Sequence, residues 1–267
     1  MAVAHPNQSR RSGLSTRAAR HGVWVLLACI AGVIVWGNHR LEVLLLLGFL
    51  APLTTAHVLS MALVGSVCWG VDVERISIFF GEPLCRFRVG GIPIELGYWP
   101  TGGSATFHRN ANGETTKQGV RSYDHLHPWQ RLVVILSGPS LLLLLGYAFI
   151  GGNSLLSILH KFLPALAGGT MSPGNQGVET LRTYFGYLEQ GAYRTAFGIL
   201  AVVVAGVHLL PLLTLNGGEA LLEAAQMLIR RKLAFRAVTA LRAASLLMVW
   251  AIMVPWAYAF FLAVFIR

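Results

Sequence analysis

The chain of 267 residues is predicted to be a mainly α-helical membrane protein, with about five transmembrane helices and a small membrane-associated β-sheet between the second and third spans. Hydrophobic residues make up 55% of the chain and charged residues only 12%, about half the share usual in soluble domains. Long apolar runs recur along the chain, and most Lys and Arg residues flank them. These three observations together predict a multi-pass membrane protein.

The expected elements follow in order from a basic, polar tail over residues 1–21. No cleavage-site pattern follows a short apolar core, so this tail is expected to be retained. The first apolar run, 23–37, is short for a span, whereas the second, 41–69, is long enough to cross with tilt. The remaining spans are expected over 132–150, 196–215 and 244–266, within a single membrane domain of residues 22–267.

Two segments interrupt the apolar pattern. Residues 71–107 are rich in β-branched and aromatic residues, and the pair Gly90-Gly91 is typical of a hairpin turn, so a β-rich insert is predicted there. Residues 151–193 mix apolar and polar residues and are expected to be an extracytoplasmic loop, part of which lies at the interface as an amphipathic helix.

Charge predicts the orientation. The tail, the segment between the second and third spans, and the segment after the fourth are rich in Arg and Lys, whereas the 151–193 loop holds only Lys161 and Arg182. The positive-inside rule then puts the N terminus in the cytoplasm. A compact layout without organelle signals favours a bacterial cytoplasmic (inner) membrane. The net charge of +10 is attributed to topology and to contact with the lipid bilayer, and no nucleic acid is expected, since no aromatic-basic stacking surface is visible.

Four stretches, in this order, resemble the site-2 protease family of intramembrane zinc metalloproteases. They are GVDVERISIFFG at 70–81, PTGGSA at 100–105, RLVVILSGP at 131–139 and HLLPLLTLNGG at 208–218. The resemblance implies a strand after a first catalytic helix, a Pro-x-Gly-Gly turn in a membrane-associated sheet, a helix with a Gly-Pro step, and a turn that carries a metal-binding Asp.

The chain departs from that family at the residues that carry the chemistry. The resemblance implies a His-Glu-x-x-His motif, and a count back from Gly70 puts it at residues 58–62, whose sequence is Val-Leu-Ser-Met-Ala. A start at His57 gives Val58 in place of Glu and Met61 in place of the second His. The degenerate positions are therefore Val58, Leu59, Ala62 and, in place of the metal-binding Asp, Asn216. Zinc hydrolysis needs about three metal ligands and a general base, so no catalytic residue and no metal cofactor are expected.

Two His-containing patterns leave an alternative open. His57 and His208 lie in apolar runs near the implied metal position, so a relocated zinc site, completed by Glu219 or Asn216, would make the chain an active intramembrane zinc metalloprotease. The simpler interpretation is that both are buried polar residues that bond across helices. A pigment ligand is a further possibility. The run Asp124-His125-Leu126-His127 is either a second metal-binding pattern or a solvated loop before a span.

The function predicted is that of a catalytically inactive site-2 protease homologue, which acts as a membrane subunit, scaffold or adaptor. Its partner is expected to be another integral membrane protein or a membrane complex. The resemblance implies that the membrane-associated sheet offers an edge to which an extended segment of a membrane protein adds as a strand. The candidate partner-binding residues are those of the apolar strand and the glycine turn: Val73, Ile76, Ile78, Phe79, Phe80, Gly102 and Gly103.

Overall fold

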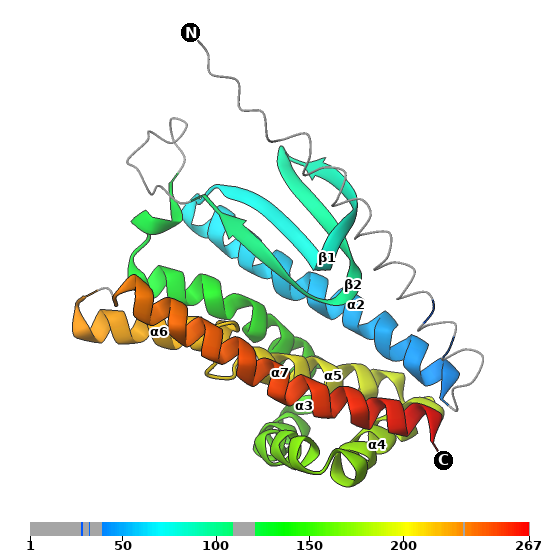
Figure 1. Cartoon of the computed structure of the whole chain (residues 1–267). Coiled ribbons are helices and arrows are strands. Elements are labelled where there is room, and N and C mark those ends of the chain that lie inside the picture. Colours follow the sequence, from blue (N-terminus) through cyan, green and yellow to red (C-terminus); the bar gives the residue numbers. More distant parts are fainter. Residues whose placement is uncertain (1–27, 29–31, 33–38, 109–120, 232, 267) are drawn as a thin grey trace, which may run out of the picture.

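The computed structural model describes residues 28, 32, 39–108, 121–231 and 233–266. Helix α2 separates the sheet from the other helices (Figure 1). The elements are α2 (Arg40–Leu63), the π-helix η1 (Val64–Cys68), β1 (Val73–Val89), β2 (Ile92–Phe107), the short η2 (Tyr123–His125), α3 (Pro128–Met171), the π-helix η3 (Pro173–Gly177), α4 (Val178–Glu189), α5 (Tyr193–His208), α6 (Asn216–Ile229) and α7 (Phe235–Phe265).

Three described helical segments are long and apolar enough to cross a membrane: Arg40–Cys68, Pro128–Met171 and Phe235–Phe265. They correspond to the second, third and fifth predicted spans. The fourth predicted span corresponds to α5, which is apolar but only 16 residues long. The first predicted span, 23–37, lies almost wholly outside the described residues, as does the tail. The chain is therefore mainly helical, and the described residues hold three candidate membrane spans where four were predicted.

The predicted loop at 151–193 is mostly helical, which corrects the expectation from sequence. Helix α3 continues to Met171 after a kink at Gly151, whose φ of 75° lies in a region that glycine adopts without strain. The part of α3 after this kink, residues 152–171, forms a second helical arm, and η3 and α4 follow it. In the sequence, a glycine such as Gly151 is typical both of a helix end and of a kink with a single positive φ inside a helix, so the two cases look alike.

The two strands form a bent antiparallel hairpin that packs on α2. The turn at Gly90 and Gly91 has positive φ values of 59° and 86°, so the predicted hairpin is confirmed. Ile76 pairs with both Ala105 and Ile94, because β2 bends and its two halves flank the start of β1. The buried side chains of the sheet contact α2 in one hydrophobic cluster, which contains Val58, Ala62, Val73, Ile76 and Ile94.

Candidate functional site

The site begins at the turn between α5 and α6. The chain leaves α5 at His208, passes Pro211 and starts α6 at Asn216. A Cβ atom on Gly217 would collide with the backbone of Leu209, and one on Gly218 would collide with the backbone of Leu212. The Gly-Gly pair therefore lets the turn fold tightly back on the start of α6. This close contact fixes the Asn216 side chain among α2, α3 and α5.

Both the nitrogen and the oxygen of the Asn216 carboxamide have hydrogen-bond partners. Its Nδ2 donates to the backbone oxygen of Ile135 at 2.7 Å and contacts the sulfur of Met61 at 3.1 Å. Its Oδ1 lies 3.1 Å from Nδ1 of His208 and accepts a hydrogen bond when His208 carries its proton there. Asn216 thus joins α2, α3 and α5 through neutral partners. We call His57, Met61, His208 and Asn216 the Asn216 cluster.

His57 completes the cluster by stacking on His208. The ring centroids are 3.9 Å apart and the planes differ by 24°. His57 is only 2% exposed, and its Nδ1 is buried without a hydrogen-bond partner. Gly138 of α3 makes room for this ring, since a Cβ there would lie 2.6 Å from both Nδ1 and Cε1 of His57. The Gly-Pro step of α3 therefore has a packing role at the site.

The face of α2 that meets Asn216 carries His57 and Met61, which are one helical turn apart. Val58 and Ala62 belong instead to the cluster that packs on the sheet. If the implied His-Glu-x-x-His motif starts at His57, its two metal-ligand positions, 57 and 61, face the site. The count back from Gly70 placed the start of that motif one residue later, at Val58. That count crosses the π-helix η1, and a π-turn holds one residue more than an α-turn. The His57–Met61 spacing of four residues was the sequence signal for this face.

A zinc ion does not fit this donor set as it stands. Zinc in proteins is held by imidazole, thiolate and carboxylate groups that converge on one point. The lone pairs of two stacked imidazoles lie in nearly parallel planes and diverge from a common centre, while the other donors are a neutral thioether and a neutral amide. In the part of the chain that the structure describes, no three His, Cys, Asp or Glu residues group together as a metal site.

The acidic residues nearest the cluster are held by arginines. Glu219, which the alternative zinc site would use, accepts from both Nε and Nη2 of Arg242, at 3.1 and 2.6 Å. Glu223 lies 3.1 Å from Arg131, and each of these two side chains is 16% exposed. Neither carboxylate is bonded to His57 or His208. The geometry therefore gives the relocated zinc site no third ligand.

The Asp124–His127 pattern has a structural use. The backbone nitrogen of His127 donates to the Gln130 side chain at 2.8 Å and so caps the start of α3. Asp124 and His125 are exposed in the short η2 helix. This arrangement favours the reading of a loop before a span.

The predicted partner-binding residues divide into buried and accessible groups. Val73 and Ile76 are 4% and 5% exposed because they face α2, so the prediction that they offer a binding surface is wrong. Phe80 is 55% exposed, whereas Ile78 and Phe79 are half-buried. The glycines serve packing: a Cβ on Gly102 would strike the Phe80 ring, and one on Gly103 would lie 2.8 Å from Val58.

An open cleft of about 570 Å³, which the sequence did not indicate, lies beside the cluster. Met61 and Ile135 line it from α2 and α3, and the last residues of β2 line it from the sheet. Those β2 residues, 105–107, pair with β1 and with no second strand among the described residues. The cleft thus joins a free strand edge to the Asn216 cluster. Its other lining residues include Glu219, Glu223 and Arg242.

Comparison with known proteins agrees with the resemblance seen in the sequence. A protein of Helicobacter pylori (strain ATCC 700392 / 26695) named "Putative zinc metalloprotease" is 34% identical over 124 residues, which are 45% of this chain and 31% of that protein. The chain therefore spans about a third of the length of this relative. The profile of Peptidase family M50 matches residues 50–252, which include β1, β2 and the whole Asn216 cluster. Because this match covers well over half of the chain, the protein belongs to peptidase family M50, the site-2 protease family.

Proposed function

We propose that this protein is a catalytically inactive member of family M50, which acts as a membrane subunit, scaffold or adaptor for another integral membrane protein. The observation that carries the proposal is the bonding of Asn216. Its amide is occupied by His208, Met61 and Ile135, all neutral, at the position where the family resemblance implies a metal-binding carboxylate.

Two requirements of metal-assisted hydrolysis are unmet at this position. A metal must be held by charged or strongly donating ligands so that it lowers the pKa of a bound water, and a base must accept the proton. The residue after His57 is Val58, which is fully buried against the sheet. The carboxylates of Glu219 and Glu223 are paired with arginines and are not bonded to the cluster.

The same geometry supports a binding role. The edge of β2 at residues 105–107, which has no second strand partner among the described residues, borders the cleft, and the backbone groups of an edge strand can pair with an extended segment of another chain. The exposed Phe80 lies on the same hairpin. An inactive member of the family can therefore hold a segment of a membrane protein without cutting it.

Metal content and proteolysis of the purified protein test the inactive state. After exposure to Zn²⁺ and removal of free metal, the wild-type protein is expected to retain no stoichiometric zinc and to leave a panel of single-span membrane proteins intact. The triple variant Val58→Glu, Met61→His and Asn216→Asp restores the implied ligands and base, and it is expected to retain about one zinc ion per chain. Stoichiometric zinc and zinc-dependent cleavage by the wild-type protein would falsify the proposal.

A further inference from the structure

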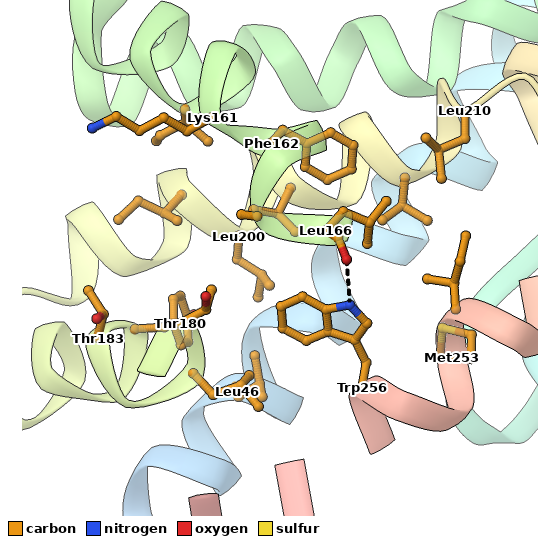
Figure 2. Close-up of a pocket in the computed structure, with 18 of the residues that line it drawn as sticks. Leu46, Lys161, Phe162, Leu166, Thr180, Thr183, Leu200, Leu210, Met253 and Trp256 are labelled. Atoms are coloured by element: carbon orange, nitrogen blue, oxygen red, sulfur yellow. Dashed lines mark hydrogen bonds between the residues drawn. The ribbon is translucent and has the colours of Figure 1, made fainter. Parts of the chain in front are cut away.

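A second cavity, of about 810 Å³, lies among the second arm of α3, α4, α5, the 210–215 turn and α7 (Figure 2). Its volume is within the range of about 300–1,000 Å³ that is usual for sites that hold a small molecule. Leu212 and Leu215 of its wall directly precede Asn216, but no residue of the Asn216 cluster lines it. The cavity is therefore distinct from the cleft and plays no part in the proposed binding of a protein segment.

The lining of this cavity is apolar at one end and polar at the other. Figure 2 shows Lys161, Thr180 and Thr183 at one end and Leu210 and Met253 at the other. Between them the wall is built from aliphatic and aromatic side chains such as Leu200. An occupant that matches this wall has an apolar body and a polar head.

The polar end carries one cation and one anion. Lys161 of α3 and Glu179 of α4 both line the cavity and are exposed, and neither is ion-paired within the described part of the chain. A head group with a single negative charge would satisfy Lys161 alone. A zwitterionic head group, with a phosphate and an ammonium, complements both residues.

Two aromatic side chains form fixed parts of the cavity wall. Tyr184 lines the cavity, but its hydroxyl oxygen is buried out of reach of a water-sized molecule, so its ring and not its hydroxyl borders the space. Trp256 donates to the backbone oxygen of Leu166 at 3.3 Å. The polar contacts of an occupant are therefore expected at Lys161 and Glu179.

We propose that this cavity binds one zwitterionic phospholipid, with one acyl chain against the apolar wall, the other acyl chain outside the cavity, and the head group between Lys161 and Glu179. Two walls belong to α3 and α7, which are long and apolar enough to cross a membrane, so the cavity borders helices that lipid can contact. A transmembrane helix is too large an occupant: at about 10 Å across and about 30 Å long it has roughly three times the volume of the cavity.

Native mass spectrometry of the full chain in detergent tests this proposal with phosphatidylethanolamine as the probe. Phosphatidylglycerol, which keeps the phosphate but lacks the ammonium, and free palmitate, which lacks both groups, serve as comparators. The wild-type protein is expected to retain one phosphatidylethanolamine at a concentration at which neither comparator is retained. Equal retention of all three amphiphiles would overturn the assignment of the head group.

Matched variants locate the binding. Ala165→Trp fills the cavity and is expected to abolish retention, whereas Ala167→Trp, on an exposed part of the same helix outside the lining, is expected to leave it unchanged. Lys161→Gln and Glu179→Gln each remove one charged contact at nearly constant volume, and each is expected to weaken retention by about tenfold. Wild-type retention by Ala165→Trp, or by both polar variants, would refute the site.

A photoreactive lipid gives a readout on the wild-type protein, so the proposal stays testable if Ala165→Trp does not fold. A phosphatidylethanolamine with a diazirine at the end of one acyl chain is expected to label the 210–215 turn, which lies at the apolar end of the cavity. Labelling confined to outward-facing residues of α7 such as Leu247, which is 71% exposed, would mean that the lipid only covers the surface, and would overturn the proposal.

Discussion

The imidazole rings of His57 and His208 stack at a centroid distance of 3.9 Å, and Gly138 provides the space that the first ring occupies. The two rings come from α2 and α5, so their contact joins helices that are far apart in the sequence. The bonding of Asn216 to His208 extends this contact to α6. The predictions below test whether this cluster acts as a structural unit and which surface meets a partner.

Gly138→Ala is expected to destabilise the protein by about 1–3 kcal/mol, because the added methyl group would lie 2.6 Å from the His57 ring and overpack the helix contact. Thermal unfolding in detergent measures the loss. Gly186→Ala is the matched control: Gly186 lies within α4, has open space at its Cβ position, and should tolerate the change.

A double-mutant cycle identifies the cause. In a His57→Ala background the same Gly138→Ala change is expected to cost clearly less, since the ring that the methyl group meets is gone. Additive effects would show that Gly138 is needed for a reason other than the approach of His57.

Asn216→Ala is expected to lower the free energy of unfolding by about 1–3 kcal/mol, since it leaves the Ile135 oxygen and Nδ1 of His208 without their partner in a partly buried site. Denaturant titration of the purified protein measures this change. Asn153→Ala, at an exposed position, is the control and should stay within about 0.5 kcal/mol of the wild type. An equally small effect of Asn216→Ala would contradict a structural role for the amide.

Arg131→Met is expected to destabilise the protein by about 1–3 kcal/mol, because it strands Glu223 in a pair whose side chains are each 16% exposed. Arg75→Met breaks a pair with Glu95 in which Arg75 is 50% exposed, and it should cost under about 1 kcal/mol. Thermal unfolding at low and high salt separates the two cases, since salt screens only the exposed pair effectively. Equal losses for both variants would show that burial does not set the strength of these pairs.

Site-specific photo-crosslinking tests the partner surface. A photoreactive residue in place of Thr106, in the cleft, or of Phe80, on the exposed hairpin, is expected to capture a membrane protein in cells. The same residue in place of Leu156, which is 65% exposed on the second arm of α3, is the control and should not capture that protein. Identical crosslinks from all three positions would indicate random collision in the membrane, and the proposed binding edge would then be wrong.

Hydropathy along the sequence predicted most of the long helices of the fold. The segments around α2, α3 and α7 were predicted because about 20 apolar residues in succession are needed to cross a bilayer, and that requirement can be read locally. The helical arm after Gly151 could not be read in this way. Residues such as Asn153, Lys161 and Pro164 interrupt its apolar pattern, so the arm lacks the unbroken apolar run by which the other helices were predicted.

The candidate site shows the same division. Asn216 at the head of the Asn-Gly-Gly turn, and the absence of any acid between Val43 and Val71, were both evident from the sequence. The assignment of Val73 and Ile76 to a binding surface failed because alternation along a strand does not show which face meets α2. The sequence also did not show that Met61, and not Ala62, faces Asn216, because the π-helix η1 shifts the helix face by one residue.

The sequence by itself determined that this is a membrane protein of the site-2 protease family in which the implied acid and ligand residues are replaced, because residue identity is local information. The tertiary structure decided that His57, Met61, His208 and Asn216 meet, that the edge of β2 borders a cleft, and that α3, α4 and α7 line a second cavity. The contact between Met61 and Asn216 joins residues 155 apart in the sequence, and helix packing at glycines such as Gly138 sets such contacts, which local patterns do not encode.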